Sequence, residues 1–181
     1  MTLLAALVST SARVAGTSAR LAKISALAEL LRALMPEEIE AAVHYLSGNL
    51  PQGRFGIGYR ALQAVADEAA AQDSTLSVLA THGRIDDLAA QRGAGSAARR
   101  ERALRDFFAL ATREEQKFLI RLLTGELRQG ALEGVMVEAI AAAAGIPVTH
   151  ARRAAMFSGD LGRLARVALT EGVEALGKFS L

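Results

Sequence analysis

The feature that most restricts the fold is a repeat, because two stretches 77 residues apart carry the same pattern. Residues 46–53 read Leu-Ser-Gly-Asn-Leu-Pro-Gln-Gly, and residues 123–130 read Leu-Thr-Gly-Glu-Leu-Arg-Gln-Gly without a gap. The same shift places Glu37 and Glu38 on Glu114 and Glu115. Such self-similarity indicates a repeated structural unit. We therefore predict two copies of a helix–helix–loop–helix unit, related by an internal pseudo-two-fold axis, over about residues 20–62 and 97–139.

Apolar residues recur at helical spacing along nearly the whole chain, and no stretch alternates as a strand does. Ala, Leu, Arg, Glu and Lys make up 98 of the 181 residues, a composition typical of helical proteins. We predict a compact all-α domain of about ten helices that spans residues 1–181 as a single unit. The expected helices cover 18–35, 36–47, 59–71, 97–111, 113–123, 132–144, 147–157 and about 160 to the end, with short helices and loops over 72–96.

Several classes of chemistry find no support in the sequence. The chain has no cysteine, which excludes disulfides, thiolate metal sites and cysteine nucleophiles. His44, His82 and His150 have no second ligand at metal-binding spacing, so we expect no metal site. The neighbouring carboxylates Asp86 and Asp87 are more simply explained as a solvated face or a charge pair near a helix start than as paired catalytic acids.

The long uncharged stretches are too short to cross a membrane. Residues 1–12 also lack the basic segment of a signal peptide, and residues 139–149 are broken by Gly145 and Pro147. We therefore expect a soluble, cytoplasmic protein without membrane contact.

The repeated glycine loops suggest binding to a polyanion. A glycine loop that leads into a helix presents free backbone N–H groups at the positive end of the helix dipole. Two such loops on one face would match successive phosphates of a nucleic-acid backbone. The alternative is that Gly48 and Gly125 are only left-handed helix caps. A third segment, residues 92–105, holds five arginines and one glutamate; it is either a phosphate contact or a solvated linker with a basic helix face.

Four segments resemble the N-terminal DNA-binding domain of ATP-dependent DNA ligases of the bacterial, actinobacterial type. They are residues 17–24, 45–48, 118–130 and 154–161, and the resemblance covers almost the whole chain. It implies an all-helical domain that wraps the minor groove of nicked duplex DNA and contacts phosphates without reading sequence. Such a domain would hold the nick for sealing in replication, repair or recombination.

The resemblance also implies which residues contact DNA. In the first loop they are Ser47, Gly48, Gly53 and Arg54, and in the basic turn they are Gly93, Gly95, Ser96, Arg99 and Arg100. In the second loop they are Thr124, Gly125, Arg128, Gln129 and Gly130, and in an early helix they are Arg20 and Lys23. The first loop departs from the pattern, because Pro51 stands where the second loop has Arg128. That loop lacks a charge there, for which Arg54 would compensate.

The chemistry of the family requires a lysine nucleophile in a Lys-x-Asp-Gly motif. The three lysines, Lys23, Lys117 and Lys178, do not stand in that motif. We therefore expect no catalytic residue and no cofactor in this chain, which resembles one domain of a longer enzyme that would use ATP and Mg²⁺. Its expected partners are nicked double-stranded DNA and the remaining ligase domains in cis, and we expect a monomer associated with the nucleoid.

Two other functions remain open from the sequence. A helical-repeat adaptor for a protein partner would use the glycine loops only as turns and would expose a large apolar groove. A sequence-specific regulator would place side chains in the major groove. The regulator function is suggested by residues 141–153, which faintly resemble a helix-turn-helix, and in it Arg152 and Arg153 would contact the DNA backbone.

Overall fold

The computed structural model describes residues 1–53, 56–127 and 132–179, and these residues form α-helices, two short 3-10 helices and no named strand. The helices are α1 (Leu4–Ala15), α2 (Arg20–Ala33), η1 (Pro36–Glu38), α3 (Ile39–Leu46), α4 (Tyr59–Glu68), α5 (Val78–Ala90), α6 (Ser96–Ala109), α7 (Arg113–Thr124), α8 (Leu132–Ala144), α9 (Val148–Ser158), α10 (Leu161–Glu171) and η2 (Glu174–Phe179). The predicted all-α class is confirmed.

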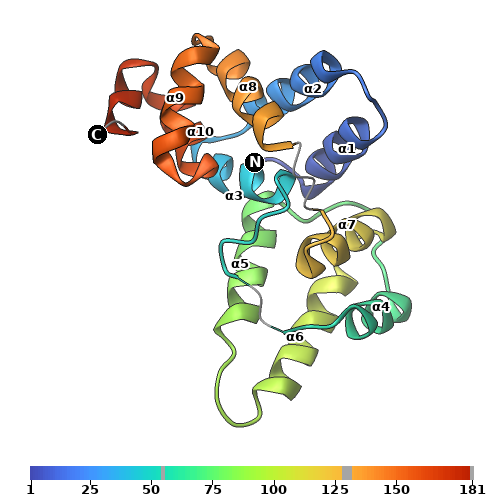
Figure 1. The fold of residues 1–181 in the computed structure, drawn as a ribbon. Helices are drawn as coiled ribbons and strands as arrows, with labels where there is room; N and C mark the ends of the chain where they lie inside the picture. The colour runs from blue at the N-terminus through green and yellow to red at the C-terminus, as the bar shows by residue number, and fades with distance from the viewer. Residues whose placement is uncertain (54–55, 128–131, 180–181) are drawn as a thin grey trace.

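The helices form two groups that meet at α3. In Figure 1 the upper group holds α1, α2, α8, α9 and α10, and the lower group holds α4, α5, α6 and α7. Within the upper group α2 packs most extensively against α8, and α10 packs against α3. Within the lower group α4 packs against α6 and α7, and α5 packs against α6. Helix α1 joins the groups by contacting both α2 and α7.

One continuous apolar core runs through both groups. Its largest fully buried side chains include Tyr45 of α3 and the adjacent Phe107 and Phe108 of α6. The two phenylalanine rings meet edge to face, with centroids 5.8 Å apart, a preferred aromatic geometry. Because α3 and α6 contribute these side chains to one core, the two groups hold each other in place.

Two expected boundaries were wrong. Residues 78–90, expected as short helices and loops, form the full helix α5, because Val78, Ile85 and Leu88 pack into the core and the Ser77 hydroxyl accepts a hydrogen bond from the Ala80 amide at 3.0 Å. The helix expected from about residue 160 to the end is divided. Its α-helical part ends before Gly172, where a φ of 81° ends the helix and η2 follows.

The two predicted repeat units have local features in common. Glu38 and Glu115 are both buried at the third position of a helical segment, where each carboxylate accepts a backbone N–H from the residue three positions earlier. Gly48 and Gly125 both follow a helix with positive φ, 68° and 79°. In each case the glycine amide and the next amide donate back to carbonyls of the last helical turn, which is a Schellman cap. The pseudo-two-fold relation between the whole units stays a prediction.

Candidate nucleic-acid interface

The turn between α5 and α6 is built on two left-handed glycines. Gly93 and Gly95 have φ of 77° and 72°, a conformation that costs glycine little and other residues more. Helix α6 then begins at Ser96 without a side-chain cap. The Ser96 amide donates to the Gly93 carbonyl at 3.2 Å, and the next two helical amides lie in the turn where N–H groups lack helical acceptors. The turn thus ends in a helix start that carries partial positive charge.

Arginines fold over this same turn and stabilise it. Arg99 donates three hydrogen bonds, to the Gln91 side-chain oxygen at 3.1 Å, the Ala94 carbonyl at 2.9 Å and the Arg92 carbonyl at 2.9 Å. Arg100 donates to the Gln91 carbonyl at 2.9 Å. These guanidinium groups satisfy the carbonyls that follow the end of α5, where cations are favoured by the helix dipole. Arg99 therefore has a structural role that the sequence did not reveal, while its position on the exposed surface keeps its charge available to a ligand.

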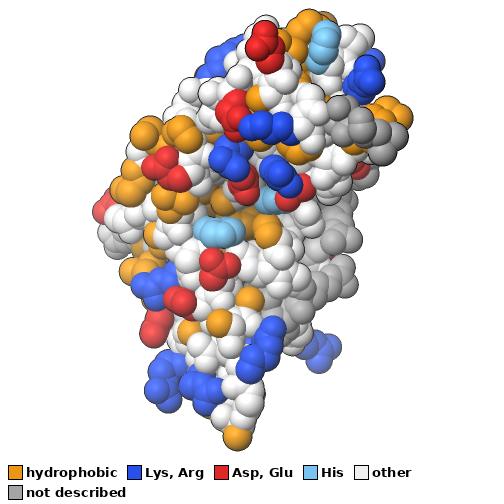
Figure 2. Space-filling view, turned by 90° about the vertical axis from the view of Figure 1, so that its left-hand side faces the viewer, with side chains coloured by type: hydrophobic (Ala, Val, Ile, Leu, Met, Phe, Trp, Pro, Cys, Tyr) orange, Lys and Arg blue, Asp and Glu red, His pale blue; other side chains and the backbone are white. Residues whose placement is uncertain are grey.

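Other cations make no such contacts. In the described part of the chain, the exposed Lys and Arg side chains with no hydrogen bond, ion pair or ring contact are those of Arg60, Arg84, Arg102, Arg121 and Arg153. Arg102 extends the basic character of the α5–α6 turn along α6. Figure 2 shows the result, because the lowest part of the molecule, where α5 and α6 turn, displays Lys and Arg as its only charged side chains in that view. Acidic, basic and histidine side chains are mixed over the middle of the same face.

The first glycine loop runs from α3 along α5 towards α6 (Figure 1). Gly48 is buried in the helix cap, whereas Gly53 is exposed with a φ of 73°. Gln52 holds the loop to α5 by donating to Asp86 Oδ1 at 2.7 Å. The Ser47 hydroxyl is buried and has no hydrogen-bond partner among the described residues. Gly48 therefore has a structural role as a helix cap, whereas Gly53 keeps an open surface.

The second glycine loop starts with the same kind of cap. Gly125 closes α7, and the Thr124 hydroxyl donates to the Ile120 carbonyl at 2.8 Å. The remaining predicted contacts of this loop, Arg128, Gln129 and Gly130, lie outside the described residues, as does Arg54 of the first loop.

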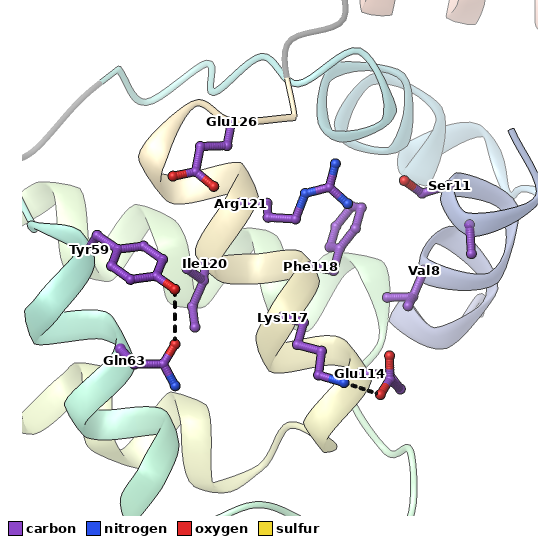
Figure 3. Close-up of a pocket in the computed structure, with 11 residues that line it drawn as sticks. Val8, Ser11, Tyr59, Gln63, Glu114, Lys117, Phe118, Ile120, Arg121 and Glu126 are labelled. Atoms are coloured by element: carbon purple, nitrogen blue, oxygen red, sulfur yellow. Dashed lines mark hydrogen bonds and ion pairs between the residues drawn. The ribbon is translucent and has the colours of Figure 1, made fainter. Parts of the chain in front are cut away.

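The structure brings the ends of the three predicted segments together around the start of α4. Gly56, Ile57 and Gly58, which complete the first loop, line a groove of about 300 Å³ with Ala97 and Arg100 of α6. On the other side of α4 a second pocket, of about 410 Å³, joins Tyr59 to Glu126 of the second loop. Figure 3 shows this pocket between α1, α4 and α7, with the Arg121 and Lys117 side chains on its wall. The start of α4 therefore lies between the first loop and the beginning of α6 on one side and the end of α7 on the other.

The predicted early-helix cations differ from each other. Arg20 of α2 is ion-paired with Glu138 of α8 at 2.9 Å, and Arg152 of α9 pairs with the same carboxylate at 2.6 Å. Hydrogen bonds from these two arginines lower the pKa of Glu138 below its ordinary value. Lys23 is half-buried and its side chain has no partner among the described residues. Arg20 thus fixes α2 against α8, and Lys23 is the freer of the two charges.

Polar side chains at the junction of α3, α5 and α10 form a network that the sequence did not reveal. The Tyr45 hydroxyl lies 2.7 Å from His82 Nδ1, and His82 Nε2 lies 3.6 Å from Asp86. His44 Nε2 lies 3.2 Å from Asp160, which also caps α10. Burial raises the pKa of the Tyr45 hydroxyl, so this group is not activated as a nucleophile. The network fixes the joint between the helix groups rather than forming a catalytic centre.

Comparison with known proteins gives the family. The sequence profile described as "DNA ligase N terminus" matches residues 61–141. A "Probable DNA ligase" of Mycolicibacterium gilvum (strain PYR-GCK) is 50% identical over 171 residues, which are 94% of this chain and 33% of that protein. A "Probable DNA ligase" of Streptomyces griseus is 48% identical over 179 residues, 99% of this chain and 35% of that protein. Residues 61–141 of the chain belong to the DNA ligase N-terminus family.

The matched profile includes the basic turn and the two helices that flank it. Residues 61–141 run from α4 to α8 and contain the whole of α5, α6 and α7. A further relative, the "Probable DNA ligase" of Anaeromyxobacter sp. (strain Fw109-5), is 48% identical over 179 residues, which are 98% of this chain and 34% of that protein. The chain spans about a third of the length of the curated relatives it matches.

The described residues contain neither a membrane-spanning helix nor a cluster of metal ligands. No helix over residues 1–53, 56–127 and 132–179 is long and apolar enough to cross a membrane. The same residues contain no group of three or more His, Asp or Glu side chains arranged to hold a metal ion.

Proposed function

We propose that this chain is the DNA-binding domain of an ATP-dependent DNA ligase. It holds nicked duplex DNA through phosphate and minor-groove contacts without reading its sequence, and the rest of the parent enzyme supplies ATP-dependent, Mg²⁺-dependent sealing. The observation that carries the proposal is the identity of about 50%, over nearly the whole chain, with proteins named as probable DNA ligases. The groove that joins the end of the first loop to the start of α6 supports a shared contact surface for that loop and the basic turn.

The residues near the basic turn favour contacts with phosphates over stacking on the bases of single strands. Arg99 and Arg100 are held rigidly over the start of α6, and a preorganised guanidinium loses little freedom on meeting a phosphate. Single-strand binding depends on aromatic platforms that stack on bases. Phe107 and Phe108, the aromatics nearest the turn in sequence, are instead fully buried.

An adaptor function finds less support. Most of the large apolar side chains that are exposed lie on separate elements, for example Leu21 on α2, Tyr59 on α4 and Leu110 after α6, and the pair Met156 and Phe157 on α9 is small. The groove beside α4 is small for a protein partner and is edged by Arg100 and Arg105. Scattered apolar side chains of this kind are normal on a protein surface.

Fluorescence anisotropy with labelled nicked, intact and single-stranded DNA tests the proposal. We expect duplex binding with little sequence preference and an affinity that falls steeply as salt rises, because bound phosphates release counterions. No duplex binding at low salt, or an affinity insensitive to salt, would refute it. Sequence preference would indicate a regulator instead.

A pair of charge variants locates the surface. Arg102→Gln removes a charge near the turn from a side chain with no protein partner, so it should lower the salt slope by about one and weaken binding to all sequences alike. Arg13→Gln is the control, because Arg13 carries the same charge on α1, where it pairs with Glu29 at 3.0 Å far from the turn. Equal effects of the two variants would argue against the α5–α6 turn as the contact.

A further inference from the structure

Helix α9 buries its small side chains and exposes its large apolar ones. Ala151 and Ala154 are 0% and 3% exposed, whereas Met156 and Phe157 are 81% and 46% exposed. Burying a Met or Phe side chain away from water stabilises a fold. The folded domain leaves most of Met156 and nearly half of Phe157 unburied, so a partner surface that covered them would add to stability.

The exposed face of α9 has the composition of a protein interface. Arg153 lies three and four residues before Met156 and Phe157, so the three side chains share one side of the helix. Arg153 is exposed and makes no hydrogen bond or ion pair within the described residues. Met, aromatic residues and Arg are the types enriched in interface cores. Leu21 on α2 is similarly exposed, at 80%, but has no large exposed apolar residue beside it on its helix.

The last described segment is anchored beside this face. Helix η2 packs against α9 and α10, with Leu176 and Phe179 buried. The Arg163 guanidinium lies over the Phe179 ring, 5.7 Å from its centroid, and Lys178 pairs with Glu171. Figure 1 shows the C-terminal end of the chain next to α9, at the opposite end of the molecule from the α5–α6 turn. Residues that follow in a longer polypeptide therefore leave the domain close to Met156 and Phe157.

We propose that the Met156–Phe157 face of α9 is the docking surface for the remainder of the longer ligase polypeptide. This inference rests on the proposed function, since it takes the chain as one domain of a ligase, and the curated relatives are about three times its length. The complementary surface is apolar, with a carboxylate positioned to meet Arg153.

The size of the face argues for an occupant in the same polypeptide. A stable complex of separate proteins buries about 800 Å² on each partner, more than two side chains provide. A tethered domain needs less, because a short linker gives an effective concentration in the millimolar range. Interfaces between domains of one chain are accordingly smaller and more polar than obligate ones. A tether that begins at η2 places the occupant next to α9 from the outset.

Hydrogen exchange of α9 tests this docking. In the complete ligase polypeptide, the amides of residues 148–158 should exchange about tenfold more slowly than in the 181-residue chain, since covering a helix suppresses its local opening. The double variant Met156→Ser with Phe157→Ser should return exchange to the rate of the 181-residue chain. Leu21→Ser is the matched control and should leave the protection unchanged. The proposal would be overturned if α9 exchanged at the same rate in both polypeptides. It would also be overturned if Leu21→Ser removed as much protection of α9 as the double variant does.

Three added measurements separate the other occupants and the dependence on DNA binding. Protection of α9 that appears only with DNA would show a DNA contact, and protection that grows with the concentration of the 181-residue chain would show a second copy; either result overturns the docking. The double variant should melt like the parent chain, because both side chains are exposed, and should bind DNA like it. The unaltered 181-residue chain could fail to bind duplex DNA while α9 remains protected in the long polypeptide. That result would refute the proposed function and leave the docking intact.

Discussion

The buried carboxylate of Glu115 is expected to be a major source of stability, and Glu115→Ala measures it. Glu115 is 1% exposed, and its carboxylate accepts hydrogen bonds from the Thr112 amide at 2.8 Å and the Ser74 hydroxyl at 2.6 Å. The Thr112 hydroxyl in turn accepts from the Glu115 amide at 3.3 Å, which completes a capping box. One side chain thus fixes both the start of α7 and the segment that leads into α5.

The expected cost follows from these bonds. A hydrogen bond to a charged group contributes about 1.5–3 kcal/mol, so two contribute about 3–6 kcal/mol. Removing the carboxylate also relieves its desolvation, which favours the lower end of that range. We expect Glu115→Ala to lower the free energy of unfolding by about 3 kcal/mol. At about 2–4 °C per kcal/mol for a domain of this size, the midpoint of thermal unfolding should fall by about 6–12 °C.

Urea denaturation followed by circular dichroism gives this number, with Glu114→Ala as the control. Glu114 is the adjacent carboxylate, but it is exposed and pairs only with Lys117 at 2.7 Å. Exposed pairs contribute little, so the control should lose at most about 0.5 kcal/mol. Equal losses for the two variants would refute the assignment of the stability to the buried bonds. Glu38→Ala should resemble Glu115→Ala, because Glu38 accepts from the Met35 amide and from the Thr2 amide and hydroxyl.

Two further outcomes are expected. Gly125→Ala should destabilise the domain by about 1–2 kcal/mol, because the φ of Gly125 is 79°. Gly83→Ala is the control; Gly83 occupies an uncrowded position within α5, so this variant should stabilise the domain by about 0.5–1 kcal/mol. Similar urea midpoints for the two variants would contradict the assignment of Gly125 as a helix cap. Burial holds the pKa of His44 below its ordinary 6.5, against the attraction of Asp160 and Glu40. The unfolded chain then binds the proton more readily, so the free energy of unfolding should fall as pH drops below about 6.5. His44→Gln should lack that part of the decrease, and identical pH profiles between 7.5 and 5.5 would contradict it.

The helical class and most helix positions could be predicted because they depend on local patterns. Apolar periodicity, Pro36 and the glycines after α3 and α7 act within a few residues of where they stand. Helix α5 was missed because its identity depends on the core, where Ile85 and Leu88 are fully buried. A short window of sequence does not show which of its side chains will be buried against a distant element.

The candidate site was predictable as a set of segments but not as a set of contacts. Loop composition pointed to residues 92–105 and to the two glycine loops. It could not show that Arg99 donates to three acceptors of its own turn, or that Gln52 holds the first loop to α5. The acceptors of Arg99 lie five to eight residues away in the sequence, whereas Asp86 lies 34 residues from Gln52. Long-range pairing of this kind is fixed by the fold alone.

The position of the arginines explains how a domain with a net charge of +2 would bind a polyanion. Arg13, Arg20 and Arg166 are neutralised by carboxylates on neighbouring helices and hold the upper group together. Arg99 and Arg100 instead donate to neutral carbonyls, so their charge is not cancelled by a carboxylate partner. A guanidinium that is fixed by carbonyls keeps its charge and loses its freedom before any ligand arrives, and both changes favour a phosphate. The small net charge is therefore compatible with local attraction at the turn between α5 and α6, even though Arg105, further along α6, is paired with Glu101 and Glu68.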